Sequence, residues 1–341
     1  MHRFKFLYYR WLLTRQRKRL SGFTLLELLI SIVVASIVVS GLLTLTNEIL
    51  QIDRRESTLD QVQQDMQRAM DYVSDDLKEA VYVYPDPERF TTLLASDSKF
   101  PDSSNDTPVL AFWRIDPIET NLPQVCNNVS GNSDYDEDDP DFGSCQVLRV
   151  RQSAYTLVVY VQRVNDGTNA NWSGQSRLIR YELPNYSDVA KMVETPGYRD
   201  PANLIDTEAR FEVWIPKAGT IVGNSAVLVD FVQSPSATLN RSPLSDATQA
   251  CSSFGTNVGG TFEYQVVPST ATTSTNTSFF ACVRRPDGTD GQRTNQDVYV
   301  FLKGNAIDGP PGVVNAFSEQ SALPVLETRV VVRGIIDKSL D

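Results

Sequence analysis

The sequence predicts an α+β protein in which one long N-terminal helix packs on an antiparallel β-sheet domain. Apolar residues keep a helical spacing up to about Tyr84, and no proline occurs before Pro85. Beyond that point, short runs of β-branched and aromatic residues alternate with clusters of Gly, Pro, Asn and Ser, as in antiparallel sheets. No long Pro- or Gly-rich linker marks a second domain in this β-rich part.

The chain begins with a basic leader of 22 residues that contains no acidic side chain. Its cations are Arg3, Lys5, Arg10, Arg15, Arg17, Lys18 and Arg19. Because positive charge beside an apolar span stays on the cytoplasmic side, we expect a cytoplasmic N-terminus. The C-terminal part is then periplasmic or extracellular.

An apolar segment follows the leader, and residues 28–45 contain no charge over a length that can span a membrane. A signal peptide would have a shorter apolar core with small residues after it, whereas Ser21 and Gly22 come before this segment. A plain single-span anchor remains open, but it does not explain Glu27 at the apolar edge. A carboxylate in hydrocarbon costs roughly 2.5–3.5 kcal/mol, so it normally marks a function with a partner.

The run Gly22-Phe23-Thr24-Leu25-Leu26-Glu27 resembles the cleavage and methylation motif of type IV prepilins and type II secretion pseudopilins. The resemblance covers about the first tenth of the chain. It implies a pilin-like fold, cleavage after Gly22 by a membrane aspartyl peptidase, and N-methylation of Phe23. It also implies that Glu27 pairs with the amine of Phe23 on a neighbouring subunit inside a filament.

Four segments are predicted on this basis: the cleaved leader 1–22, a transmembrane half-helix 23–46, an amphipathic half-helix 47–84 and an exported domain 85–341. A helix from Phe23 to Tyr84 would be roughly 90 Å long. Its apolar stripe beyond the span is interrupted by Glu56 and consists of Ile49, Ile52, Leu59, Val62, Met66, Ala69, Val73, Leu77, Ala80 and Val81.

Ten strands are predicted in the exported domain. They are Val109–Ile115, Gln146–Val150, Tyr155–Val164, Arg177–Leu183, Arg210–Ile215, Ala226–Val232, Phe262–Val267, Ser278–Arg284, Asp297–Leu302 and Val325–Arg333.

Four cysteines lie in the exported part, at positions that fit an oxidising compartment. They allow three pairings, of which the pairs of sequence neighbours, Cys126–Cys145 and Cys251–Cys282, are the simplest. A four-cysteine zinc site lacks the close ligand pairs that such sites use.

An acidic run, Ser133 to Asp141, places Asp134, Asp136 and Asp138 at the alternating spacing that hard cations favour. It lacks the glycine and the distal glutamate of an EF-hand loop. A solvated acidic loop and a calcium site both remain open, and we expect no other cofactor.

Enzymatic chemistry is disfavoured by the inventory of residues. His2 is the one histidine and leaves with the leader, which excludes Ser-His-Asp and Cys-His catalysis in the mature chain. No phosphate-binding or dinucleotide-binding glycine motif is present. Core packing is expected for two of Trp113, Trp172 and Trp214, and Trp172 lies in loop-like sequence that could stack on a sugar.

The overall charge is −11, and without the leader 24 basic residues face 42 acidic ones, which disfavours nucleic acid as a ligand. We therefore expect a minor pilin or pseudopilin, not an enzyme, in the inner membrane and then in a filament. The mature chain of 319 residues exceeds a typical major subunit. The expected partners are the prepilin peptidase and methyltransferase, other pilins or pseudopilins, an inner-membrane assembly platform and the lipid bilayer.

The chain is also similar to pseudopilins linked to polysaccharide secretion in motile cyanobacterial filaments, so secretion, including that of polysaccharide, or motility is the expected purpose. Two alternatives remain open. One is a membrane-anchored adhesin or polysaccharide-binding module that does not polymerise, and the other is a surface glycan hydrolase that uses a carboxylate pair.

Overall fold

The computed structural model describes residues 24–101, 106–118, 147–148, 150–167, 171–189, 193–203, 206, 208–235, 247–255, 264–269, 278–284, 296–305 and 322–333. The chain divides into two compact units, one up to Arg54 and one from Arg55 onward. The first unit contributes the exposed part of the long helix, and the second contains the sheet and the end of that helix.

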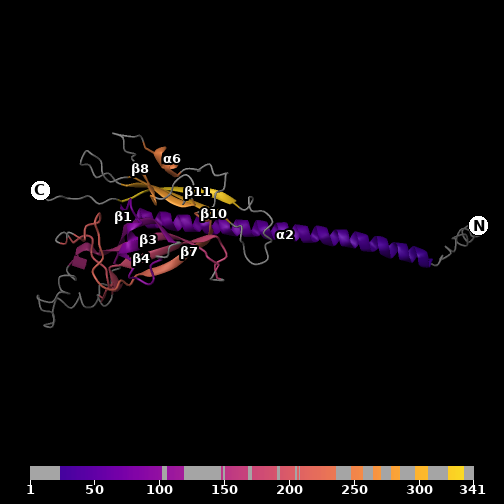
Figure 1. Ribbon diagram of the computed structural model, residues 1–341, viewed down its shortest axis with the longest axis horizontal. Coiled ribbons are helices and arrows are strands. Elements are labelled where there is room, and N and C mark those ends of the chain that lie inside the picture. The colour runs from indigo at the N-terminus through magenta and orange to yellow at the C-terminus, as the bar shows by residue number, and fades with distance from the viewer. Residues whose placement is uncertain are drawn as a thin grey trace, which may run out of the picture. The chain divides into compact units, whose positions relative to one another are not determined.

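Helix α2 runs from Leu25 to Lys78, over 54 residues without a break (Figure 1). The predicted N-terminal helix is therefore confirmed over most of its length, but its end was placed too late. Residues Ala80–Val83 form strand β1, whose β-branched and aromatic side chains pair with strand β2. The apolar spacing of Ala80–Val83 also fits a helix, but pairing with β2 decides in favour of a strand.

The sheet is antiparallel throughout and has the order β1-β2-β3-β4-β7-β10-β9-β8, with β11 on β10. Its further strands are β2 (Asp106–Pro117), β3 (Ser153–Val164), β4 (Ser176–Pro184), β7 (Asn224–Val232), β8 (Tyr264–Val267), β9 (Phe279–Arg284), β10 (Asp297–Asn305) and β11 (Ala322–Val331). A separate two-stranded sheet joins β5 (Tyr186–Asp188) to β6 (Val193–Glu194), and the short helices are α3 (Arg89–Leu93) and α6 (Ala247–Ser252).

Two predicted strands are wrong. In the run Gln146–Val150, the described residues Val147, Leu148 and Val150 are helical. Residues 210–215 form turns, and Trp214 is buried in an aromatic cluster. The Arg89 guanidinium donates hydrogen bonds to the carbonyls of Glu212 and Trp214, so these groups are satisfied without a partner strand.

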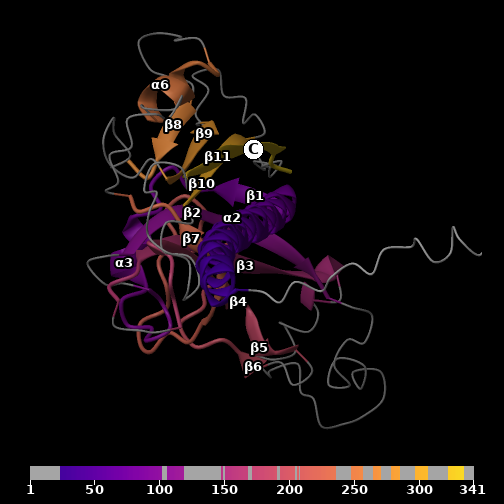
Figure 2. The ribbon, with the colours of Figure 1, turned by 90° about the vertical axis from the view of Figure 1, so that its right-hand side faces the viewer.

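The sheet curls around the end of α2, so that strands β2–β4 lie on one side of the helix and β10–β11 on the other (Figures 1 and 2). The apolar positions of the helix that face this core follow steps of three and four residues. They are Val62, Met66, Ala69, Val73 and Leu77, all buried as predicted.

A second core covers the outer face of β1–β4. It is rich in aromatic side chains from the segment around α3 and from the connection between β4 and β7, including Phe90, Trp113, Tyr198 and Trp214. A third, smaller core lies between α6 and strands β8–β10. Both faces of the sheet are thus buried, and the predicted pilin-like α+β fold is confirmed.

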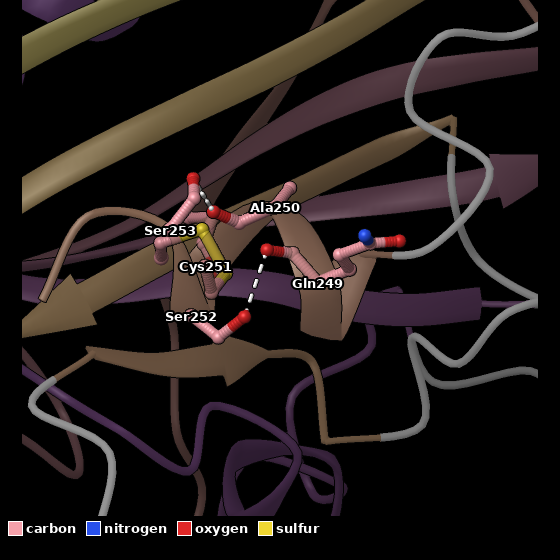
Figure 3. The surroundings of a disulfide bond; sticks show 7 residues. Gln249, Ala250, Cys251, Ser252 and Ser253 are labelled. Carbon is pink, nitrogen blue, oxygen red and sulfur yellow. Dashed lines mark hydrogen bonds between the residues drawn. A yellow bond between two sulfur atoms is a disulfide. The ribbon is translucent and has the colours of Figure 1, made fainter. Parts of the chain in front are cut away.

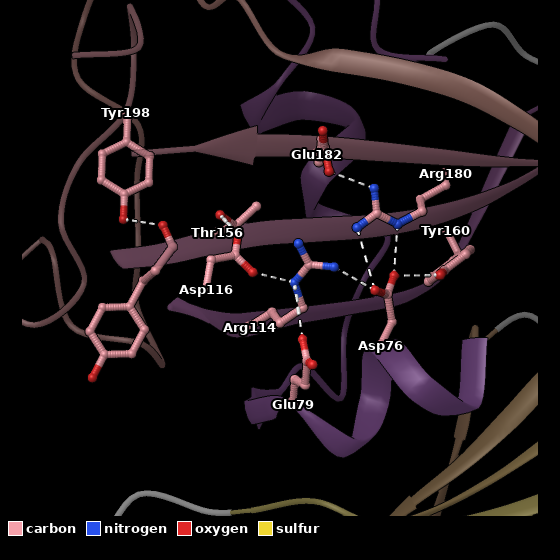
Figure 4. Close-up of polar contacts among 10 residues, drawn as sticks. Asp76, Glu79, Arg114, Asp116, Thr156, Tyr160, Arg180, Glu182 and Tyr198 are labelled. Atoms are coloured by element: carbon pink, nitrogen blue, oxygen red, sulfur yellow. Dashed lines mark hydrogen bonds and ion pairs between the residues drawn. The ribbon is translucent and has the colours of Figure 1, made fainter. Parts of the chain in front are cut away.

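Asp76 fixes the end of the helix to the sheet (Figure 4). This side chain is 6 % exposed, and its carboxylate accepts hydrogen bonds from Arg114 Nη1 on β2 at 2.5 Å and Tyr160 Oη on β3 at 2.6 Å. Arg180 on β4 adds a bond from Nε at 2.7 Å. One carboxylate therefore ties the helix to three neighbouring strands.

The two arginines are themselves held by further acids. Arg114 bonds Asp116 at 2.6 Å, and Arg180 bonds Glu182 at 2.5 Å. Burial opposes the charge on both guanidinium groups, but the hydrogen bonds and charges of Asp116, Glu182 and Asp76 outweigh it and raise the pKa of each arginine. Both guanidinium groups therefore keep their charge beside Asp76.

A disulfide joins Cys251 in α6 to Cys282 in β9, with Cα atoms 5.2 Å apart and a separation of 31 positions in sequence (Figure 3). Both cysteines are buried. The bond holds α6 over the third core, and it is one of the two pairings expected from sequence. Cys126 and Cys145, the other pair, lie outside the described residues.

We predict that Asp76→Asn lowers the free energy of unfolding by roughly 3–5 kcal/mol, because two buried guanidinium groups lose their shared carboxylate. Urea unfolding of the full chain in detergent micelles, followed by tryptophan fluorescence, measures the change. Asp75→Asn is the matched control, since the neighbouring Asp75 is 74 % exposed and pairs only with Lys78; its expected cost is about 0–1 kcal/mol. Equal losses in the two variants would contradict the anchoring role of Asp76.

We also predict that replacing both Cys251 and Cys282 with alanine costs roughly 3–4 kcal/mol, from the chain entropy that a loop of this length restricts in the unfolded state. The same urea titration under oxidising conditions reports the loss as a lower midpoint. A double variant with the midpoint of the unmodified chain would show that this bond contributes nothing to stability.

Candidate functional site at the start of helix α2

The first part of helix α2 presents apolar side chains to its surroundings on every face. Residues 24–57 are exposed wherever the structure describes their side chains, including Leu25 at 85 % and Ile37 at 67 %. An 18-residue window of this helix has a mean hydropathy of 2.6, and none of that window is buried within the chain. Among the described residues, α2 is the one helix long and apolar enough to cross a membrane.

Three hydroxyl groups inside this apolar segment donate hydrogen bonds to carbonyls of the helix itself. Ser31 donates to the carbonyl of Glu27 at 2.7 Å, Ser36 to that of Val33 at 2.8 Å, and Thr44 to that of Ser40 at 3.0 Å. Such bonds satisfy these three hydroxyl groups without water, which suits them to an apolar medium.

Thr24 caps the helix at its N-terminus. Its Oγ1 accepts a hydrogen bond from the Glu27 backbone N–H at 3.3 Å, and its carbonyl accepts the first helical bond from Leu28 at 3.1 Å. This satisfies one of the free N–H groups with which every helix begins. Thr24 is therefore the N-cap of helix α2, whose first residue is Leu25.

Glu27 lies in the first turn of α2 and is exposed. Within the part of the chain that the structure describes, its carboxylate has no hydrogen-bond donor and no cation as partner. The positive end of the helix dipole favours an acid at this position, but only in part. In an apolar medium the remaining charge requires a cation from another molecule, and an amino group can supply it.

The other residues singled out from sequence divide into two groups. Gly22, Phe23, Asp134, Asp136 and Asp138 lie outside the described residues, as do Cys126 and Cys145. The three tryptophans are placed: Trp113 and Trp214 are fully buried, whereas Trp172 is half-buried with the Arg177 guanidinium 5.2 Å from its ring centroid. In the described part of the chain, no group of acidic, His or Cys side chains is arranged to hold a metal ion.

Sequence reasoning missed Asp76 as a key side chain. It follows Val73 by three residues and precedes Leu77, so it falls on the apolar stripe of the helix as a second polar interruption besides Glu56. That position was the available signal, since an acid on a buried face requires cations across from it.

The comparisons with known proteins support the interpretation of the N-terminal motif. A family described as the prokaryotic N-terminal methylation motif matches residues 17–43, which include the leader end, Thr24, Glu27 and most of the apolar segment. No curated protein and no solved structure matches the chain. This motif, one apolar N-terminal helix and the curled antiparallel sheet that follows it are features that the chain shares with type IV prepilins and pseudopilins.

Proposed function

We propose that this chain is a subunit of a type IV pilus or type II secretion-like filament, processed at the Gly22–Phe23 bond and assembled through helix α2. The observation that carries the proposal is Glu27. It is an exposed acid, without a partner among the described residues, in an apolar helix where the hydroxyls of Ser31, Ser36 and Thr44 donate to carbonyls of the helix.

Cleavage after Gly22 creates an amino group four residues before Glu27. In one chain the two groups lie on the same short segment, and in a bundle of parallel helices the amine of one chain can reach the carboxylate of another. Because only one axial offset between neighbours brings the two charges together, the ion pair sets the register of the bundle. The exposed leucine, isoleucine and valine side chains supply the packing between helices.

A minor role in the filament is supported by the size of the exported part. The mature chain would have 319 residues, and its sheet carries an additional aromatic layer and a disulfide-bonded layer around α6. A large subunit of this kind fits a low-copy position near a filament tip, where its bulk does not have to repeat. We further propose that the filament serves secretion, including that of polysaccharide, or motility.

The proposed partners follow from the same steps. A prepilin peptidase with methyltransferase activity processes the N-terminus, the bilayer holds the apolar segment before assembly, and other pilins or pseudopilins replace lipid around it afterwards. An inner-membrane platform supports insertion of the subunit into the filament. We propose no catalytic role and no cofactor for the exported domain.

The proposed function predicts how the N-terminus is processed. Intact-mass and peptide mass spectrometry of the protein from cells with an active prepilin peptidase should find a mature terminus at Phe23 that carries one N-methyl group. Peptidase-deficient cells provide the control and should retain the leader. A protein that still begins at Met1 in peptidase-positive cells would contradict the processing step, whatever the fold of the exported part.

The proposed function also predicts how a change at Glu27 affects assembly. Glu27→Gln keeps the size and a hydrogen-bonding side chain but removes the charge, so we expect normal processing and membrane insertion with roughly tenfold less subunit in sheared filaments. Immunoblots of sheared and membrane fractions from cells that lack the native copy measure this ratio. Glu48→Gln is the matched control, because Glu48 is also exposed on α2 but lies beyond the uncharged segment.

If Glu27→Gln left both the filament fraction and the cellular function unchanged, the chain would act as a non-polymerising anchor, such as an adhesin or polysaccharide-binding module. Release of sugars by the purified protein from a panel of polysaccharides would instead identify a glycan hydrolase.

A further inference from the structure

The segment that follows helix α2 is bonded on both of its edges. On one edge, β1 pairs with β2, and the Tyr84 N–H continues this pairing with a 2.8 Å bond to the carbonyl of Ala111. On the other edge, residues 80–88 meet side chains and backbone groups from the later part of the chain, between β8 and the end of β11.

The central contact on this second edge is Gln296, which directly precedes β10. Its Oε1 accepts the Val83 N–H at 2.7 Å, and its Nε2 donates to the Val83 carbonyl at 2.8 Å. Gln296 is 4 % exposed and Val83 is fully buried. The carboxamide thus takes the place of a neighbouring strand for one residue, and water cannot replace it at this position.

Further contacts continue this edge in both directions. The Arg333 N–H donates to the carbonyl of Ala80 at 3.1 Å, and Gln265 Nε2 donates to the carbonyl of Pro85 at 3.2 Å. Ser269 reaches Glu88 through its backbone N–H and also through its hydroxyl, which lies 2.8 Å from Glu88 Oε1. Contacts therefore recur at residues 80, 83, 85 and 88, a line that we call the seam.

The seam connects the two arms of the curled sheet. Among the described residues, the backbone bonds that otherwise join the arm β1–β4 with β7 to the arm β8–β11 lie at the pair Gly304–Val232 and at the Gln233 N–H, which donates to the carbonyl of Lys303. Side-chain bonds from Gln162 to Ser278 and from Asn305 to Gln175 add to this junction. The buried end of α2 lies between these arms (Figure 2). Opening the seam would free one arm from the segment that follows the helix without breaking the β2–β3–β4 ladder.

We propose that residues 80–88 form a strap that closes the curled sheet over the end of helix α2, and that the seam is where this domain opens. The bonds of the β2–β3–β4 ladder are continuous and break together, whereas the contacts of the seam are separate and can break one by one. The seam therefore opens at a lower free energy than the ladder. In a chain held by its helix, part of any load passes from Lys78 along the backbone into β1, beside the part that Asp76 carries to β2–β4, and the strap divides its share between the two arms.

Adjacent residues of the strap report on its two edges, which makes the test direct. Hydrogen exchange of the full chain in detergent micelles, resolved to single amides by fragmentation mass spectrometry, should show the Val83 and Arg333 amides exchanging about tenfold faster than that of Tyr84. Equal exchange rates for the Val83 and Tyr84 amides would overturn the proposal, because the two edges of the strap would then open in a single event.

A variant tests whether the contacts act as one unit. Gln296→Leu removes the central contact, and the proposal requires the distant amides of Arg333 and Ser269 to exchange about tenfold faster as well. The Tyr84 amide and those of the β2–β3 ladder should keep their rates. Faster exchange at Val83 alone, with Arg333 and Ser269 unchanged, would reduce Gln296 to a local contact and overturn the strap.

Gln175→Leu is the matched control. The Gln175 carboxamide oxygen also accepts a backbone N–H, from Ser234 at 3.0 Å, together with Asn305 Nδ2 on β10 at 3.4 Å, so it belongs to the other junction of the arms and not to the seam. This variant should leave the Arg333 and Ser269 amides at their original rates. The same acceleration in both glutamine variants would indicate general loosening of the domain and would contradict a specific seam.

Discussion

The ion cluster around Asp76 is the interaction on which the exported domain depends. A helix that ends inside a sheet has to place its polar groups somewhere, and here one carboxylate receives donors from three successive strands. The cost of burying this charge is offset because Arg114 and Arg180 carry further acids at their outer sides. The cluster therefore fixes the rotation and the depth of the helix relative to β2, β3 and β4, which apolar contacts alone would specify less sharply.

The two acids of helix α2 illustrate how one element serves two surroundings. Asp76 is buried and satisfied within its own chain, whereas Glu27 is exposed and has no partner in the described part of the molecule. The difference follows from what surrounds each: a folded domain supplies its own cations, but an isolated apolar helix cannot. The need for a second molecule is thus a chemical property of Glu27 and does not depend on the details of the exported domain.

The architecture of the domain follows from burying both faces of the sheet. The inner face takes the apolar stripe of the helix, and the outer face is covered by aromatic residues from the α3 region and the long connection between β4 and β7. Because strands of both arms pack on the same helix, the arms lie close to one another. Gln296 and Arg333 then bond the segment after the helix from the side that β2 leaves open.

Most strands were predictable because alternation and β-branched residues are local properties. The strand Tyr155–Val164 is an example, and its observed limits differ by only two residues at the start. The errors share one cause, which is competition between local preference and distant partners. Ala80–Val83 keeps a helical spacing but has β2 beside it, and Arg210–Ile215 resembles a strand but has Arg89 to satisfy its carbonyls.

The amino-acid sequence by itself determined the N-terminal motif, the apolar helix and the unusual acid at Glu27, because these depend on residue order, hydropathy and charge within one continuous stretch. It also limited the four cysteines to three pairing schemes, one of which contains the bond between Cys251 and Cys282. Only the tertiary structure decided that the helix ends at Lys78, that Asp76 binds two arginines, and that Gln296 completes the edge of β1. The last two depend on groups separated by 38 to 213 positions in the chain, and no local pattern specifies which distant donor will meet which acceptor.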